Sequence, residues 1–151
     1  MHKDEFLKRY GGIYEHSPWI AEAAYGAEGI EKIHAAMKAA VAQAGHDKKL
    51  ALICAHPELG SKVKMAEASV QEQAGAGLDR CTPQEFAEFQ KLNADYNRKF
   101  GFPFIIAVKG LTREDILKAF RKRIQNEVAA EFETALEQIH KIAWFRLSAL
   151  S

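Results

Sequence analysis

The chain has 151 residues, of which 48% are hydrophobic, and this is enough to build one domain with a substantial core. Lysine and arginine number 21 against 20 aspartate and glutamate residues, so the charge balance argues against nucleic acid as a partner. No apolar stretch approaches the ~18 residues that cross a bilayer, and the first residues lack the apolar centre of a signal peptide. We therefore expect a single domain over residues 1–151, cytoplasmic and without membrane contact.

Metal-binding patterns are weak in this sequence. The two cysteines stand far apart and form no CxxC pair, so neither a disulfide framework nor a zinc site is indicated. Glu31 with His34 and Glu137 with His140 repeat the Glu-x-x-His spacing of di-iron helix bundles. Glu137, however, points roughly opposite Ile139 on the last helix and so faces solvent. We therefore predict no metal and no cofactor.

The first third of the chain reads as a series of helices. Ser17 followed by Pro18 is a helix-start signal, and Trp19 just after it is expected to pack in the core. The apolar run at residues 47–55 is ambiguous between a strand and a buried helix. No second strand candidate lies nearby, so we read it as a helix that ends at His56. The predicted helices cover residues 5–10, 18–25, 28–44 and 47–55.

The rest of the chain carries two more helix-start signals. Thr82 precedes a proline and begins a helix to about Phe100, while Thr112 with Asp115 resembles a capping box for helical structure that continues nearly to residue 151. On one side of the helix that begins after Thr82, helical spacing places an aromatic stripe made of Phe86, Phe89, Tyr96 and Phe100. Asn93 falls in this stripe, where we expect its amide to hold a neighbouring loop rather than a ligand. The predicted fold is all-α, with six to eight unequal helices and one extended loop segment.

Between His56 and Thr82 the sequence predicts one more helix, and three of its polar residues share one face. If residues from about 61 to 73 are helical, Ser69, Glu72 and Gln73 have the spacing i, i+3 and i+4 and can serve a small polar ligand. His56 precedes Pro57, which places its imidazole at a corner of the chain, where a carboxylate such as Glu72 could orient it. A surface or helix-ending histidine is the alternative reading.

Residues 101–110 form the least helical stretch, with glycine and proline at its head and β-branched residues in its middle. One extended strand cannot satisfy its own backbone groups, so main-chain amides and carbonyls here could meet a ligand or other helices. From the residues alone, a buried apolar connector is an equally good reading.

Arg146 lies on the apolar face of the last helix, together with Val128, Phe132, Ile139 and Ala143. An isolated buried charge is very unfavourable, so the guanidinium must find an anion or carbonyl groups. The residues leave three options open: a ligand, an internal ion pair with a residue such as Glu72, or a side chain that reaches water near the helix end.

Several motifs occur together and in order. They are HPELG from His56, S-x-x-EQ-x-GAGL from Ser69, LNADYNRKFGFPFIIAVKG from Leu92, and YGGIYEHSPW from Tyr10. Together they resemble the 2-oxo-4-hydroxy-4-carboxy-5-ureidoimidazoline (OHCU) decarboxylases of urate degradation. The resemblance covers essentially the whole chain, although the segment between Gly60 and Ser69 is shorter than in many relatives.

The resemblance implies a lyase that decarboxylates OHCU to S-allantoin without a cofactor. It implies that His56 protonates the product on one face and that Glu72 orients His56 or polarises the substrate hydroxyl. The other residues that it implies bind substrate are Pro57, Ser69, Gln73, the main chain of Phe104, Ile105, Ile106, Ala107 and Val108, and Arg146. The partner would be a small molecule, and a homodimer is left open.

A non-enzymatic helical module with a peptide-binding groove is the alternative function. It predicts exposed apolar residues along a groove and no chemical role for His56, whereas the enzyme predicts a closed polar pocket.

Overall fold

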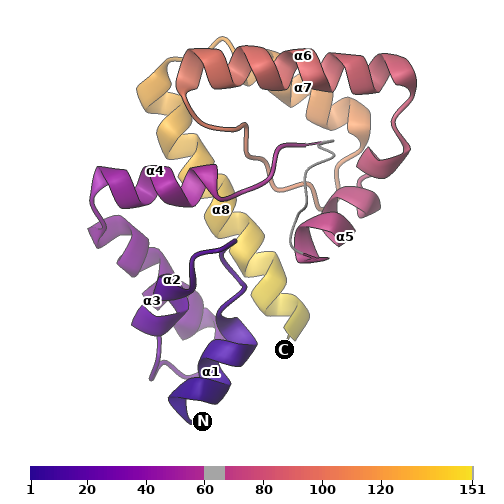
Figure 1. Cartoon of the computed structure of the whole chain (residues 1–151). Coiled ribbons are helices and arrows are strands. Elements are labelled where there is room, and N and C mark those ends of the chain that lie inside the picture. Colours follow the sequence, from indigo (N-terminus) through magenta and orange to yellow (C-terminus); the bar gives the residue numbers. More distant parts are fainter. Residues whose placement is uncertain (60–66, 151) are drawn as a thin grey trace. The chain divides into compact units, whose positions relative to one another are not determined.

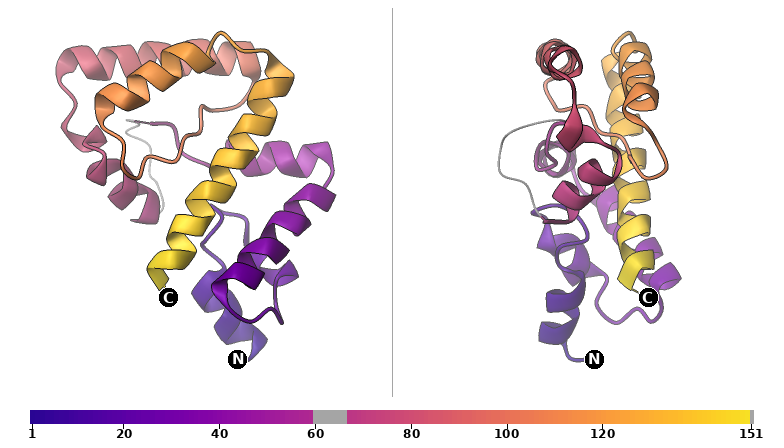
Figure 2. Two further views of the ribbon diagram at one scale, coloured as in Figure 1. Left: turned by 180° about the vertical axis from the view of Figure 1, so that it is seen from behind. Right: turned by 90° about the vertical axis from the view of Figure 1, so that its right-hand side faces the viewer.

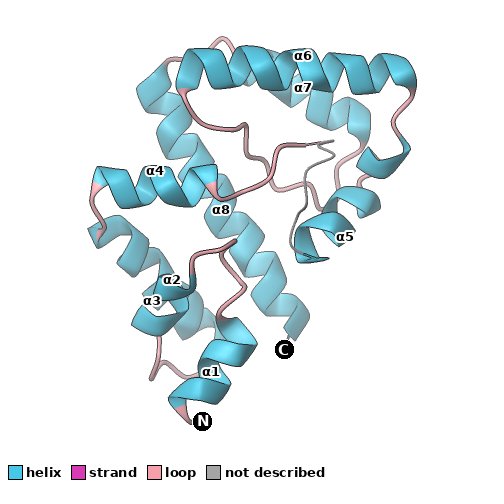
Figure 3. Cartoon of the chain, in the orientation of Figure 1, coloured by secondary structure: helices cyan, strands magenta, loops and turns pink. Residues whose placement is uncertain are grey.

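The computed structural model describes residues 1–59 and 67–150, and for residues 67–70 it describes the backbone only. Regular structure in these residues is helical, with no strand (Figures 1 and 3). The elements are α1 (Lys3–Tyr10), α2 (Pro18–Ala23), α3 (Ile30–Gln43), α4 (His46–Cys54), α5 (Glu67–Gly75), the 3-10 helix η1 (Leu78–Arg80), α6 (Pro83–Phe100), α7 (Arg113–Arg123) and α8 (Val128–Leu150). The predicted all-α fold is confirmed.

The capping signals of α6 and α7 are confirmed in detail. The Thr82 side chain accepts a hydrogen bond from the amide of Glu85, whose carboxylate accepts one from the amide of Thr82. Thr112 and Asp115 make the same reciprocal pair at the start of α7. Each box satisfies two amide donors that a helix end leaves without partners, so local sequence suffices to place these starts.

Ser17 is different, because it stands at the start of α2 but its hydroxyl makes no capping bond. It donates instead to the carbonyl of Glu15, 3.0 Å away, and so belongs to the preceding loop. Trp19 was expected to pack in the core, and this prediction is wrong. It is half-buried, and the Lys48 ammonium lies 4.4 Å from the centre of its ring.

The last helical stretch is broken where the sequence predicted continuity. α7 ends at Arg123, and α8 begins at Val128. Val128, which the helical periodicity placed on the apolar face, is 48% exposed, whereas Ile139, Ala143 and Arg146 on that face are buried. The periodicity therefore holds for the later part of α8 but not for its first turn.

The chain divides into two compact units, one formed by residues 1–56 and 139–151 and the other by residues 57–138. The prediction of a single domain is not tested by this division and stays a prediction. None of the helices in the described part of the chain is long and apolar enough to cross a membrane.

In the first unit α2 packs against both α1 and α3. The last part of α8 lies beside α3 (Figure 2), where His34 Nε2 donates to the carbonyl of His140 over 2.8 Å. Helices α2, α3, α4 and α8 contribute apolar side chains that are fully buried in this unit: Ile20, Met37, Val41, Leu52, Ile53, Ala143 and Leu147.

The second unit has an aromatic core in which α6 and α7 lie side by side (Figure 1). Tyr96 of α6 contacts several phenylalanine rings, and Phe104 stacks on Phe120 with ring centres 3.9 Å apart. The aromatic stripe predicted for α6 comprised Phe86, Phe89, Asn93, Tyr96 and Phe100. It is confirmed for the last four, which are all buried, whereas Phe86 is half-buried.

A buried ion pair between Arg123 and Glu131 lies next to Tyr96 in this aromatic core. Glu131 is fully buried, and its carboxylate accepts from Tyr96 (2.6 Å), Arg123 Nε (2.9 Å) and Asn126 (3.0 Å). Burial and, to a smaller extent, the adjacent carboxylate raise the pKa of Tyr96, so its hydroxyl stays a donor at neutral pH. Three donors compensate the lost hydration of one buried anion.

We predict that Glu131→Ala lowers the free energy of unfolding by about 3–5 kcal/mol, because it leaves Arg123 as an uncompensated buried charge. Urea denaturation followed by circular dichroism measures this change. Glu88→Ala is the matched control, since Glu88 pairs with Arg121 on the exposed surface of the same unit, and it should cost less than about 1 kcal/mol. Equal losses in the two variants would contradict the structural role of the buried pair.

Candidate functional site

His56 lies at the end of α4, where the helix stops before Pro57. A residue that precedes proline avoids the helical region, and the chain turns here with the His56 amide bonded to the carbonyl of Ile53. The side chain is nevertheless 5% exposed, so it is no surface histidine. The surface alternative of the sequence reading is therefore excluded.

The hydrogen bonds of His56 define its tautomer. Nδ1 lies 2.9 Å from the carbonyl oxygen of Leu52, and because a carbonyl can only accept, Nδ1 carries the proton. Nε2 is buried and has no hydrogen-bond partner among the described residues. In the neutral imidazole, Nε2 thus presents a lone pair, and the residue that fixes this tautomer is Leu52, one turn earlier in α4.

Burial lowers the pKa of His56 to about 4, because the imidazolium would lose its hydration. The bond to Leu52 and the carboxylate of Glu15 oppose this change, while the Arg146 guanidinium and, when protonated, the His16 imidazole act in the same direction as burial. His56 is therefore neutral at pH 7, with an accepting Nε2. Such a group can take up a proton and return it as a strong acid.

Arg146 of α8 is 8% exposed and is held by the loop between α1 and α2. Its Nη1 donates to the carbonyl of Ile13 over 3.0 Å and lies 3.4 Å from a carboxylate oxygen of Glu15. The internal ion pair considered from the sequence thus exists, with Glu15 as an anion that it contains.

Sequence reasoning missed Glu15. The residue stands in a short loop, where acidic side chains are normally solvated, and no periodic pattern marks it as buried. The structure leaves it 1% exposed. The only available sequence signal was its place in the YGGIYEHSPW motif, between two aromatic positions.

In the second unit three amide side chains hold the chain after Pro57. Gln73 donates to the carbonyl of Glu58 (3.3 Å), Asn93 to the carbonyl of Leu59 (3.0 Å), and Asn97 to the carboxylate of Glu58. The loop-holding role predicted for Asn93 is therefore confirmed. Gln73 is buried and part of its hydrogen-bonding capacity serves this loop.

The segment from Phe104 to Val108 has no regular secondary structure and is largely buried, so it is a buried connector and not a strand. Several of its main-chain groups bind within the protein. The carbonyl of Ile105 accepts from Arg123 (2.6 Å), the amide of Ala107 donates to Gln138 (2.9 Å), and the carbonyl of Val108 accepts from Leu111 (3.0 Å). Ligand contacts of this segment would have to use its other main-chain groups.

The remaining predicted site residues are less defined. Glu72 is half-buried on α5, and Pro57 is half-buried after α4. The side chain of Ser69, and the predicted helical start near residue 61, lie outside the described residues. Within the first unit the structure brings His56, Glu15 and Arg146 close enough for their charges to interact, and within the second it links Gln73 to the segment after Pro57.

Both cysteines carry free thiols, Cys54 exposed and Cys81 half-buried. In the described part of the chain, no group of three or more histidine, cysteine, aspartate and glutamate side chains could hold a metal ion.

Comparison with known proteins gives consistent matches. Residues 1–148 match the family described as OHCU decarboxylase. The 2-oxo-4-hydroxy-4-carboxy-5-ureidoimidazoline decarboxylase of Haloferax volcanii is 42% identical over 148 residues, which are 96% of this chain and 88% of that protein. The uric acid degradation bifunctional protein PucL of Bacillus subtilis is 44% identical over 141 residues, 91% of this chain but 28% of that protein.

The fold has a match among solved structures as well. The crystal structure of an (S)-allantoin synthase superposes with a TM-score of 0.80 and 38% sequence identity. The match covers 99% of this chain and 51% of that one, so the chain spans about half of the solved protein.

We predict that the protein loses stability as the pH falls from 6.5 towards 4. Burial lowers the pKa values of His56 and His140 to about 4, so in this window the unfolded chain binds protons that the folded chain does not. Each such histidine adds a slope of up to about 1.4 kcal/mol per pH unit to the free energy of unfolding.

Urea denaturation at about pH 7.5, 6.5 and 5.5 measures this slope, above the range where most carboxylates titrate. His56→Gln should make it shallower, and His46→Gln, the same substitution at an exposed position of the same unit, is measured beside it as the control. An unchanged slope in His56→Gln would show that His56 is not buried in the neutral form.

Proposed function

The chain belongs to the OHCU decarboxylase family, and from this we infer that it decarboxylates 2-oxo-4-hydroxy-4-carboxy-5-ureidoimidazoline to S-allantoin in urate degradation. The observation that carries this function is the match over nearly the whole chain, at 42% identity, to a relative of that name. It favours the enzyme over the peptide-binding module. The substrate is a small molecule.

The reaction needs little more than proton transfer at one carbon. The electron pair of the breaking carbon–carboxylate bond moves into the adjacent C=N bond, whose nitrogen takes up a proton, and carbon dioxide leaves. The resulting enol becomes a ring carbonyl, a lactam, when its hydroxyl loses a proton and the ureido-bearing carbon gains one. Delivery of that last proton to one face sets the handedness of allantoin.

We assign this proton transfer to His56. Its accepting Nε2 can take the hydroxyl proton of the substrate, and the imidazolium so formed can give a proton to the ureido-bearing carbon from one side. A lowered pKa supports this assignment, because it makes the imidazolium a strong acid towards carbon. His56 acts as proton donor only after it has first been an acceptor.

The other site residues stay proposals. Glu72 would orient His56 or polarise the substrate hydroxyl. Pro57, Ser69, Gln73 and the main chain between Phe104 and Val108 would bind ring and ureido groups. Arg146 would bind an anionic or carbonyl group of the substrate, because its planar fork of donors suits such oxygens. Gln73 and Arg146 are buried, which supports polar contacts that exclude water.

We further propose that the reaction needs no metal or cofactor, since the cleaved bond is already adjacent to an electron-accepting C=N group of the substrate. A cytoplasmic location and a homodimer are kept as proposals from the sequence.

We predict that His56→Gln lowers kcat/KM by about 100-fold or more, the usual contribution of a general acid–base residue. The assay generates the substrate in place from urate and follows the circular dichroism of the allantoin formed. His46→Gln, an exposed histidine of the same unit, is the matched control and should keep the parent rate. Formation of S-allantoin at the parent rate by folded His56→Gln would remove His56 from the mechanism.

We also predict that dialysis against a chelator changes neither the turnover number nor the melting temperature, because no bound metal is required. The metal content of the dialysed protein should be measured in the same samples. Activity that is lost on dialysis and restored by one added metal would contradict the cofactor-free reaction.

A further inference from the structure

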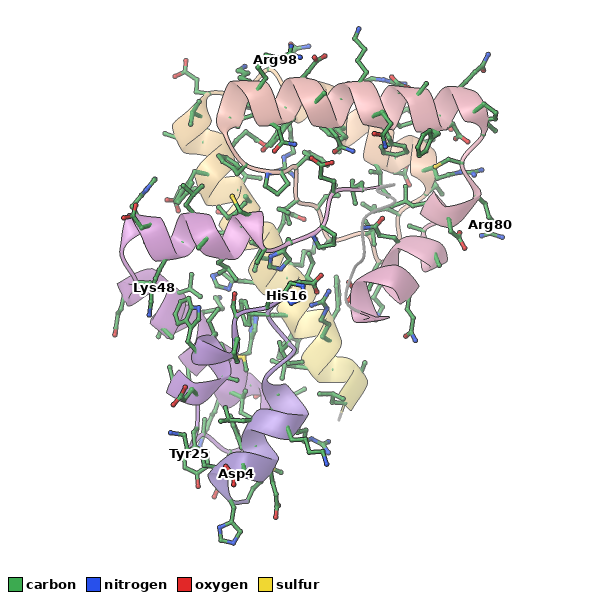
Figure 4. All side chains as sticks on the ribbon, in the orientation of Figure 1. Asp4, His16, Tyr25, Lys48, Arg80 and Arg98 are labelled. Carbon is green, nitrogen blue, oxygen red and sulfur yellow. The ribbon has the colours of Figure 1, made fainter. Side chains whose placement is uncertain are left out.

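Glu15 is a buried carboxylate with no role in the proposed reaction so far. It is 1% exposed, although it stands in the loop between α1 and α2. Burying an anion costs several kcal/mol unless a partner compensates it, so such a residue needs a reason to be inside. The same loop carries His16, labelled in Figure 4, which is exposed and directly follows Glu15 in the chain.

The loop is built to hold Glu15 in place. His16 has a φ of +50°, a left-handed backbone conformation that residues other than glycine seldom adopt. At this turn the buried Glu15 is followed by the exposed His16. Ser17 donates to the carbonyl of Glu15. Tyr14 is tied to α8 by a 2.7 Å hydrogen bond between its hydroxyl and Nδ1 of His140.

One nitrogen of Arg146, Nη1, contacts this loop at two oxygen atoms. It donates to the carbonyl of Ile13 and faces the carboxylate of Glu15 at 3.4 Å. A neutral carbonyl alone would fix the position of the guanidinium but would not balance its charge. The carboxylate does both, and so it limits the rotation of a side chain that otherwise has many conformers.

Glu15 also acts on His56. Three charged or titratable side chains influence the imidazole: the Glu15 carboxylate favours its protonated form, whereas Arg146 and His16 oppose it. Glu15 is the only anion among these three. Its charge therefore offsets part of the effect of Arg146 on the same imidazole.

We propose that Glu15 is a positioning residue of the decarboxylase, which holds the Arg146 guanidinium in the orientation that binds substrate. This proposal rests on the proposed function, because the substrate-binding role of Arg146 comes from it. The reach of the Glu15 side chain and its charge are separate properties, so two variants can test them one at a time.

Glu15→Gln keeps the shape but removes the charge, while Glu15→Asp keeps the charge but shortens the reach to Arg146. For Glu15→Gln we expect KM to rise at least about tenfold, the loss typical of one charge-assisted hydrogen bond, and kcat to fall as well. For Glu15→Asp we expect a raised KM with kcat near the parent value. Arg146→Lys should resemble Glu15→Asp in KM, because an ammonium lacks the planar fork.

The charge effect is measured without substrate. Nuclear magnetic resonance of the imidazole nitrogens gives the fraction of protonated His56 at the lowest pH at which parent and variant both stay folded. This fraction should be smaller in Glu15→Gln than in the parent and unchanged in Glu15→Asp. Glu22→Gln, which removes an exposed carboxylate of the same unit, is the control and should alter neither this fraction nor KM.

The outcomes are separable. If the parent protein makes no S-allantoin, the proposed function fails, whereas the His56 titration still tests whether the Glu15 charge acts on the imidazole. If the parent is active and folded Glu15→Gln keeps its KM, kcat and His56 titration, Glu15 is only structural and the proposal is overturned. If Glu15→Gln does not fold, Glu15→Asp decides, and a parent-like KM in that variant overturns the positioning role.

Discussion

Buried arginine charges need an anion, and this requirement organises both compact units. In the first unit Arg146 pairs with Glu15 and also donates to the carbonyl of Ile13. In the second unit Arg123 pairs with Glu131 and also donates to the carbonyl of Ile105. In each case one guanidinium balances a buried carboxylate and at the same time anchors a loop without regular structure. Removing either partner would leave an uncompensated buried charge, so each pair resists displacement of its loop.

The same use of side chains on loop backbone recurs after Pro57, where the amides of Gln73 and Asn93 bind the carbonyls of the next two residues. Loops normally lie on the surface because buried backbone groups need partners. Here side chains of neighbouring helices supply these partners. The consequence for the enzyme is that residues on irregular segments are held in defined positions, as catalysis by proton transfer requires.

His56 illustrates how position alone changes chemistry. In water an imidazole is half-protonated near pH 6.5, but burial at the end of α4 keeps this one neutral, and Leu52 assigns its proton to Nδ1. The accepting nitrogen is thereby reserved for another partner. A carboxylate and a guanidinium near the same imidazole then act on its protonated form in opposite directions, so the loop between α1 and α2 adjusts the basicity that α4 provides.

Local patterns in the sequence determined the helical class, the starts of α6 and α7, the aromatic face of α6 and the burial of Arg146, because capping and periodicity depend on neighbours within a few residues. The sequence also carried the motifs that place the chain in its family. Tertiary structure alone decided that Glu15 is the anion for Arg146, since 131 residues separate the two and no local pattern connects them. It likewise decided that Trp19 lies against Lys48 and that Val128 is exposed. Each of these depends on which distant element packs against a residue, and helical periodicity contains no information about that choice.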